Sequence, residues 1–136
     1  MQNFDVAAWF AAIAFICAVD ALWFAFAWDN VYNFNTLFKN KPNFAIGAFY
    51  VVACAVFAAT VLVSLRGASY EEAASTGALI GGLVFFVFNA CACFIVNHID
   101  GDVNTQWTPK AAMCDLFYGT AVYTAATVII YSIAGP

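Results

Sequence analysis

The sequence predicts an all-α protein, a four-helix transmembrane bundle of up-down-up-down topology. Hydrophobic residues make up 65% of its 136 residues and charged residues only 9%, with a mean hydropathy of +0.87, whereas soluble domains carry ~25% charged residues. Apolar segments of about twenty residues recur along the chain, and a helix of that length crosses a ~30 Å hydrocarbon layer. We expect one domain, residues 1–136, in a lipid bilayer, with spans at about 6–27, 44–65, 76–96 and 109–133.

The alternative is a soluble protein in which these segments are buried helices. A soluble chain of this composition has too few polar side chains to cover its surface, and the same apolar pattern repeats in all four segments. The bilayer is therefore the favoured environment.

The first predicted span, residues 6–27, carries a stripe of alanines at helical spacing. Such a stripe lets a neighbouring helix approach closely, where dispersion replaces the hydrophobic drive that lipid removes. We expect Ala11 and Ala18 to lie in this contact, in line with Ala7, Ala14, Ala21 and Ala25. Asp20 interrupts the span about 100° around the helix from Ala21, so it need not face the same neighbour.

The second span, residues 44–65, contains only mild polar groups, among them Tyr50, and Arg66 with Gly67 ends it. Ser69 followed by Glu72 three residues later resembles a capping box. This pair predicts that the third helix begins before Thr76.

The third span, residues 76–96, has no formal charge. Its Gly77 and Gly81 stand four apart on one helix face, where two backbones can approach closely, and its Asn89 is an amide that hydrocarbon cannot satisfy. We therefore expect tight packing on one side of this helix and a polar contact on another.

The fourth span, residues 109–133, is predicted to start where Thr108, an N-cap residue, precedes Pro109. It carries Asp115 inside the apolar segment and Gly119 one turn later, a further candidate for close helix packing.

Four polar side chains fall at one predicted depth: Asp20, Tyr50, Asn89 and Asp115. Each lies six or seven residues inside its span, roughly 10 Å below the same membrane face. An aspartate at a span centre costs about 2.5–3.5 kcal/mol, so we expect these groups to face the bundle interior and to bond to one another. Two interpretations remain: a hydrogen-bonded clamp that sets helix packing, which we favour, or a proton- or cation-responsive pocket in which the two carboxyls share a proton.

The distribution of charged residues predicts the membrane topology. Four spans put both termini on one side, and the loops around Lys39, Lys41 and Lys110 then share the other side, away from Arg66. The positive-inside rule places loops one and three in the cytosol. The net charge of −4 argues against a nucleic-acid partner.

Motifs for cofactors, metals and catalysis are missing or incomplete. Asp100-Gly-Asp102-Val-Asn104 imitates an EF-hand opening, but Thr105 and Ala111 replace the required glycine and glutamate. His98, the only histidine, has no nearby thiol or imidazole, so we predict no metal site. The sequence has no Gly-rich phosphate loop, nucleophile elbow or H-E-x-x-H motif, and we predict no cofactor.

Short motifs spread over almost the whole chain carry a family resemblance. They are Asp20-Ala-Leu-Trp23, Tyr32, Phe49-Tyr50, Gly77-Ala-Leu-Ile-Gly81, Trp107 near Pro109, and Asp115-x-x-Tyr118-Gly119-Thr120. In these the chain resembles an uncharacterised family of small four-span predicted membrane proteins, found in bacteria and in some large DNA viruses of algae. The family's span-three signature, tyrosine-aspartate-leucine-threonine-asparagine, is replaced here by Phe88-Asn89-Ala90-Cys91-Ala92. The resemblance implies a four-span fold and, through its viral members, the internal membrane of an icosahedral capsid.

We therefore predict a non-enzymatic integral membrane protein with a structural or assembly role, in a virion or another large complex with neighbouring protein subunits. The alternative is a small proton- or cation-coupled transporter or channel that uses Asp20 and Asp115. A membrane thiol enzyme is a third class, and it would need two of the five cysteines within disulfide range, with Cα atoms at most ~7 Å apart.

Overall fold

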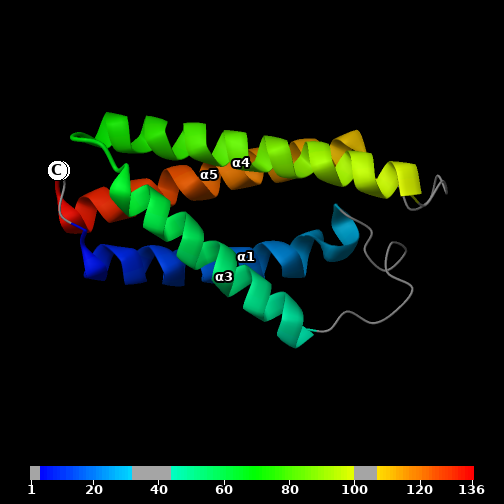
Figure 1. The fold of residues 1–136 in the computed structure, drawn as a ribbon, viewed down its shortest axis with the longest axis horizontal. Helices are drawn as coiled ribbons and strands as arrows, with labels where there is room; N and C mark the ends of the chain where they lie inside the picture. Colours follow the sequence, from blue (N-terminus) through cyan, green and yellow to red (C-terminus); the bar gives the residue numbers. More distant parts are fainter. Residues whose placement is uncertain (1–3, 32–43, 100–106) are drawn as a thin grey trace.

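The computed structural model describes residues 4–31, 44–99 and 107–136. In this part of the chain it contains four helices and no strand: α1 (Val6–Asn30), α3 (Phe44–Ser64), α4 (Tyr70–Ile99) and α5 (Pro109–Ala134). Figure 1 shows that successive helices run in alternating directions along one long axis. The predicted all-α fold is therefore confirmed.

Each helix holds a segment that is long and apolar enough to cross a membrane: Val6–Ala27, Ala45–Ser64, Tyr70–Phe94 and Pro109–Ala134. Large apolar side chains cover the outer surface of the bundle, for example Leu22 and Phe49, which are 71% and 76% exposed. Such a surface is suited to the hydrocarbon core of a bilayer, which offers no hydrogen-bond partners to polar groups. The chain is a multi-pass integral membrane protein.

The helix ends follow the capping signals in the sequence. The Ser69 Oγ accepts a hydrogen bond from the Glu72 backbone N–H at 3.1 Å, and the Glu72 carboxylate accepts one from the Ala68 N–H at 2.7 Å. This variant of the capping box starts α4 at Tyr70, before Thr76 as predicted. Thr108 caps α5 by accepting from the Ala111 N–H at 3.1 Å, and Pro109 opens the helix.

Helix α5 is the central helix of the bundle. It packs most extensively against α4, less against α1 and least against α3, and α1 also packs against α3. In Figure 1, α3 crosses α1 obliquely, so that its Ser64 end lies near α4 and α5 whereas its Phe44 end diverges from them. The Phe44 end of α3 therefore lies farther from α4 than its Ser64 end does.

Glycines bring the backbones of α4 and α5 into contact. A Cβ atom added at Gly77 would lie 2.5 Å from the Tyr123 carbonyl oxygen, and one added at Gly81 would lie 2.7 Å from the Gly119 carbonyl oxygen. Gly119 itself lies against the ring of Phe85. Only glycine allows this approach, and all three predicted packing glycines lie in the α4–α5 contact.

The alanine stripe of α1 requires a correction. Ala7, Ala14, Ala18, Ala21 and Ala25 are exposed on the outside of the bundle, and Ala11 is only half-buried. The face that packs inward instead carries Ala8, Ala12 and Ile16, at four-residue spacing with Asp20. A carboxyl in hydrocarbon costs about 2.5–3.5 kcal/mol, while an alanine gains little more from a helix than from lipid. The polar side chain therefore decides how α1 is rotated.

The bundle divides at mid-height into two halves that pack differently. We call the half near the described termini the closed half and the other the open half; they comprise residues 6–16, 54–64, 70–84 and 119–134, and residues 17–30, 44–53, 85–99 and 107–118, respectively. The main core cluster lies in the closed half, and half of its buried residues are alanines, packed with larger side chains such as Leu62, Val63 and Ile130. A smaller cluster in the open half contains Ala27, Trp107 and Ala111.

Candidate functional site

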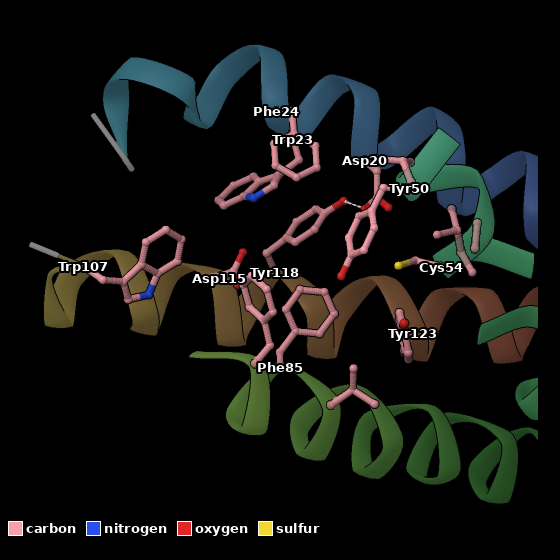
Figure 2. Close-up of a pocket in the computed structure, with 15 residues that line it drawn as sticks. Asp20, Trp23, Phe24, Tyr50, Cys54, Phe85, Trp107, Asp115, Tyr118 and Tyr123 are labelled. Atoms are coloured by element: carbon pink, nitrogen blue, oxygen red, sulfur yellow. Dashed lines mark hydrogen bonds between the residues drawn. The ribbon is translucent and has the colours of Figure 1, made fainter. Parts of the chain in front are cut away.

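A cavity of about 200 Å³ opens at mid-height and extends into the open half, between α3 and α4. Figure 2 shows the fifteen residues that line it. Two are tryptophans, three tyrosines and three phenylalanines, and two are aspartates. The cavity therefore combines an aromatic wall with carboxyl groups at membrane depth.

The cavity has a buried floor and an exposed mouth. Ile16, Ala55 and Tyr123 form part of the floor and are almost completely buried. At the mouth, Tyr50 on α3 and Phe88 on α4 are 63% and 48% exposed. These residues lie on the outer surface of helices that hydrocarbon surrounds, so the cavity opens sideways toward the bilayer.

A three-residue hydrogen-bonded network holds the α4 wall to the start of α5. The Asn89 side-chain amide donates to an Asp115 carboxyl oxygen at 2.9 Å, and it also donates to the Phe85 carbonyl oxygen at 2.8 Å. The Trp107 indole N–H donates to the Asn89 amide oxygen at 2.9 Å. Asn89, Trp107 and Asp115 are all at least 94% buried. One amide thus satisfies two buried groups that would otherwise lie in hydrocarbon.

A second contact joins α1 to α5 across the cavity. The Tyr118 hydroxyl donates a hydrogen bond to an Asp20 carboxyl oxygen, as the dashed line in Figure 2 shows. The ring of Tyr118 stacks on the ring of Trp23, with centroids 4.4 Å apart and planes inclined by 8°. Asp20 and Trp23 therefore contact the same α5 side chain, one through a polar group and the other through its ring face.

The structure gathers the four polar residues that sequence analysis placed at one depth. Asp20, Tyr50 and Asp115 line the cavity, and Asn89 lies directly behind Asp115. Asp115 and Asn89 bond to each other, whereas the hydrogen bond of Asp20 goes to Tyr118. Tyr50 differs from the expectation that it faces a packed interior, because it lies at the exposed mouth with its ring turned into the cavity (Figure 2). It does so because α3 diverges from α4 at this level.

Two important site residues, Trp107 and Tyr118, were not predicted as members of the polar layer. Tyr118 lies three residues after Asp115, and Trp23 three residues after Asp20, so each pair shares one helix face. That spacing was the available signal for Tyr118 and Trp23. Trp107 precedes α5, and only the fold brings its indole to Asn89.

The cavity has an acidic character. Its lining includes the carboxyl groups of Asp20 and Asp115, and no lysine, arginine or histidine is among the described residues that line it. The described part of the chain has no group of three metal-ligating side chains, and the EF-hand-like segment 100–105 lies outside it. All five cysteines are free thiols, and Cys54 lines the cavity. The arrangement can hold a cation or a hydrogen-bond donor against an apolar, aromatic wall.

Comparison with known proteins gives no match: no family model fits the chain, and no curated protein or solved structure is similar to it.

Proposed function

We propose that this protein is a non-enzymatic structural component of a membrane, built into a larger assembly. The most direct support is that its few polar side chains inside the bundle form hydrogen bonds between different helices. Asn89, Trp107 and Asp115 join α4 to α5, and Tyr118 joins α5 to α1 through Asp20. Polar groups that bond across helices fix how a bundle packs, which is the task of a scaffold.

The outer surface supports the same proposal. The alanine stripe on α1 faces outward, and small residues on an outer face allow a further helix to approach closely. We propose that neighbouring subunits, together with lipid, cover these faces. A nucleic-acid partner is not proposed, because the net charge is −4.

The setting follows from the resemblance described above. We propose membership of the uncharacterised four-span family, and a place in the internal membrane of a virion or in another large membrane complex. We also propose that the loops containing Lys39, Lys41 and Lys110 face the cytosol. A single cysteine introduced at Ser69 of a cysteine-free variant tests this orientation: a membrane-impermeant maleimide should label it from outside intact cells, and labelling only after lysis would reverse the orientation.

Isolation from the native membrane in mild detergent tests the structural role. We expect the chain to migrate in a complex far larger than its own 14.7 kDa, with other subunits in defined ratio. A solitary monomer that retains its lipid and its fold would contradict the proposal.

One observation favours a second candidate, a small proton- or cation-coupled transporter. Asp20 on α1 and Asp115 on α5 line the same cavity, so a transported ion could be exchanged between them. This function predicts flux of protons or monovalent cations into liposomes, abolished by Asp20→Asn or Asp115→Asn. Liposomes that are no leakier with the protein than without it, over a panel of such ions, would exclude this candidate.

A further inference from the structure

We propose that the cavity binds a small organic ammonium cation with an apolar body, which enters from the bilayer between α3 and α4. This proposal concerns binding alone. It rests neither on the structural role nor on transport. The binding proposal can therefore fail while either of those functions holds, and it can hold while either of them fails.

Charge complementarity is the first argument. Two carboxyl groups, from Asp20 and Asp115, reach one cavity whose described lining contains no basic side chain. In a low-dielectric site the attraction between opposite charges is much stronger than in water, so a cation that enters the cavity offsets the cost of carboxylates at this depth. A quaternary ammonium has no N–H group, and its attraction does not require an unused hydrogen-bond acceptor on either aspartate.

The aromatic wall is the second argument. Trp23, Tyr50, Trp107 and Tyr118 line the cavity together with Tyr123 and three phenylalanines. The faces of such rings attract ammonium groups, most strongly where water is excluded, and they also provide apolar contacts for the body of a ligand. Figure 2 shows Trp23, Tyr118 and Tyr50 around the space near Asp20. Carboxylates and ring faces thus favour the same class of ligand.

The size and lining of the cavity narrow this class further. A dry cavity of ~150 Å³ holds benzene in another protein, so about 200 Å³ accommodates one ring and a small ammonium head. Ca²⁺ and Mg²⁺ prefer about six to eight oxygen ligands, and this mainly aromatic wall does not offer so many. Phosphate-bearing lipid headgroups are disfavoured, because both aspartates repel them.

The route of entry follows from the packing of the helices. Helix α3 diverges from α4 at this level (Figure 1), and the residues at the mouth, such as Phe88 and Val84, are partly exposed on the outer surface. A lipophilic cation dissolved in the bilayer therefore reaches the cavity sideways, without passage through the polar loops.

Binding of benzyltrimethylammonium to the full chain in phosphatidylcholine nanodiscs tests the proposal. Radiolabelled ligand and equilibrium dialysis should show saturable binding of one molecule per chain. Neopentylbenzene, which has the same shape with carbon in place of the charged nitrogen, should compete at least about tenfold less well, because it loses the attraction to the carboxylates and ring faces. Absence of saturable binding, or equal competition by the neutral compound, would overturn the proposal without the use of any variant.

Two pairs of variants then locate the site. Asp20→Asn should weaken binding about tenfold, while Glu71→Gln, which removes an exposed carboxylate in the first turn of α4, should leave it unchanged. Val84→Trp should block binding, because Val84 lines the cavity, whereas Val87→Trp adds the same bulk to an exposed position of α4 outside the lining. Equal affinity of Asp20→Asn and Glu71→Gln, or of both tryptophan variants, would contradict the assignment. Circular dichroism confirms that each compared variant is folded.

Discussion

The closed and open halves of the bundle use the same four helices but hold them together by different means. In the closed half, Gly77 and Gly81 let the backbones of α4 and α5 touch, and fully buried alanines fill the remaining space. In the open half, α3 diverges from α4, and hydrogen bonds among Asn89, Trp107 and Asp115 join α4 to the start of α5. Close packing of small residues therefore holds most of the closed half, whereas hydrogen bonds between buried side chains hold the open half.

This difference shows how a membrane bundle can be stable and still contain a cavity. Lipid removes most of the hydrophobic drive for helix association, so dispersion between small residues and interhelical hydrogen bonds remain. Dispersion requires a gap-free contact, which the closed half provides. Hydrogen bonds need only a few points of contact, and they leave room between the helices of the open half.

The end of the closed half has a polar lock of its own. Arg66 follows α3 and is 3% exposed. Its guanidinium donates to the Gly135 and Val63 carbonyl oxygens, both at 3.0 Å. These carbonyls lie at the C-terminal ends of α5 and α3, where a positive charge is favoured by the helix dipoles. The lock keeps α3 close to α5 at this end while its other end diverges.

The largest effect should follow from adding bulk to the closed half. We expect Gly77→Val to lower the free energy of unfolding by about 3 kcal/mol, since its side chain would overlap the Tyr123 carbonyl and the Thr127 hydroxyl. Unfolding by SDS titration in mixed micelles measures this loss. Gly82→Ala is the matched control, because a Cβ there would meet its nearest neighbour at an ordinary 3.7 Å. Equal stability of both variants would show that close backbone contact does not hold this half.

The next effect tests the polar network of the open half. Asn89→Leu should cost about 2 kcal/mol in the same titration, because it leaves the buried Trp107 indole and Asp115 carboxyl without the amide that joins them. Cys91→Leu, an exposed position on the same helix, serves as the control and should be nearly neutral. If Asn89→Leu is as stable as Cys91→Leu, apolar packing alone holds the open half.

A smaller effect is expected at the contact between α1 and α5. Tyr118→Phe keeps the ring that stacks on Trp23 and removes only the hydroxyl that donates to Asp20. We expect a loss of about 1 kcal/mol. Tyr131→Phe removes a hydroxyl with a longer bond of 3.3 Å to the Ala68 carbonyl and should cost less. A greater loss for Tyr131→Phe would reverse this ranking.

The smallest effect on stability is expected for a hydrogen bond between α1 and α3. Among the described residues of the closed half, it is the one hydrogen bond between side chains of these two helices. The Trp9 indole donates to the Thr60 hydroxyl at 3.0 Å on the outer surface. A double-mutant cycle of Trp9→Phe and Thr60→Val should give a coupling energy of about 0.6 kcal/mol, the average for hydrogen bonds between membrane helices. A coupling above that of the Asn89 and Asp115 pair would mean that a side-chain hydrogen bond holds α1 to α3 in the closed half as strongly as the polar network holds the open half.

Hydrophobicity along the chain was sufficient to predict the four helices, because their length and lack of charge do not depend on how they pack. Ser69, Glu72 and Thr108 predicted where two of them begin, since capping is local. The rise per residue of a helix converts a position in the sequence into a height along the helix axis. It was therefore sufficient to predict a common depth for Asp20, Tyr50, Asn89 and Asp115. Gly77 and Gly81 indicated one tight face because no other residue allows such an approach.

Only the tertiary structure decided which faces meet. The alanine stripe of α1 looked like the packing face, yet the rotation of α1 brings Asp20 and Trp23 to Tyr118 and turns Ala18 outward. The cavity arises because α3 crosses α1 obliquely and diverges from α4, while the packing of α5 against α4 brings the Trp107 indole to Asn89. Hydrocarbon contacts every apolar face about equally well, so the sequence determined what crosses the membrane. The few polar partners and backbone contacts between distant helices determined how those segments are arranged.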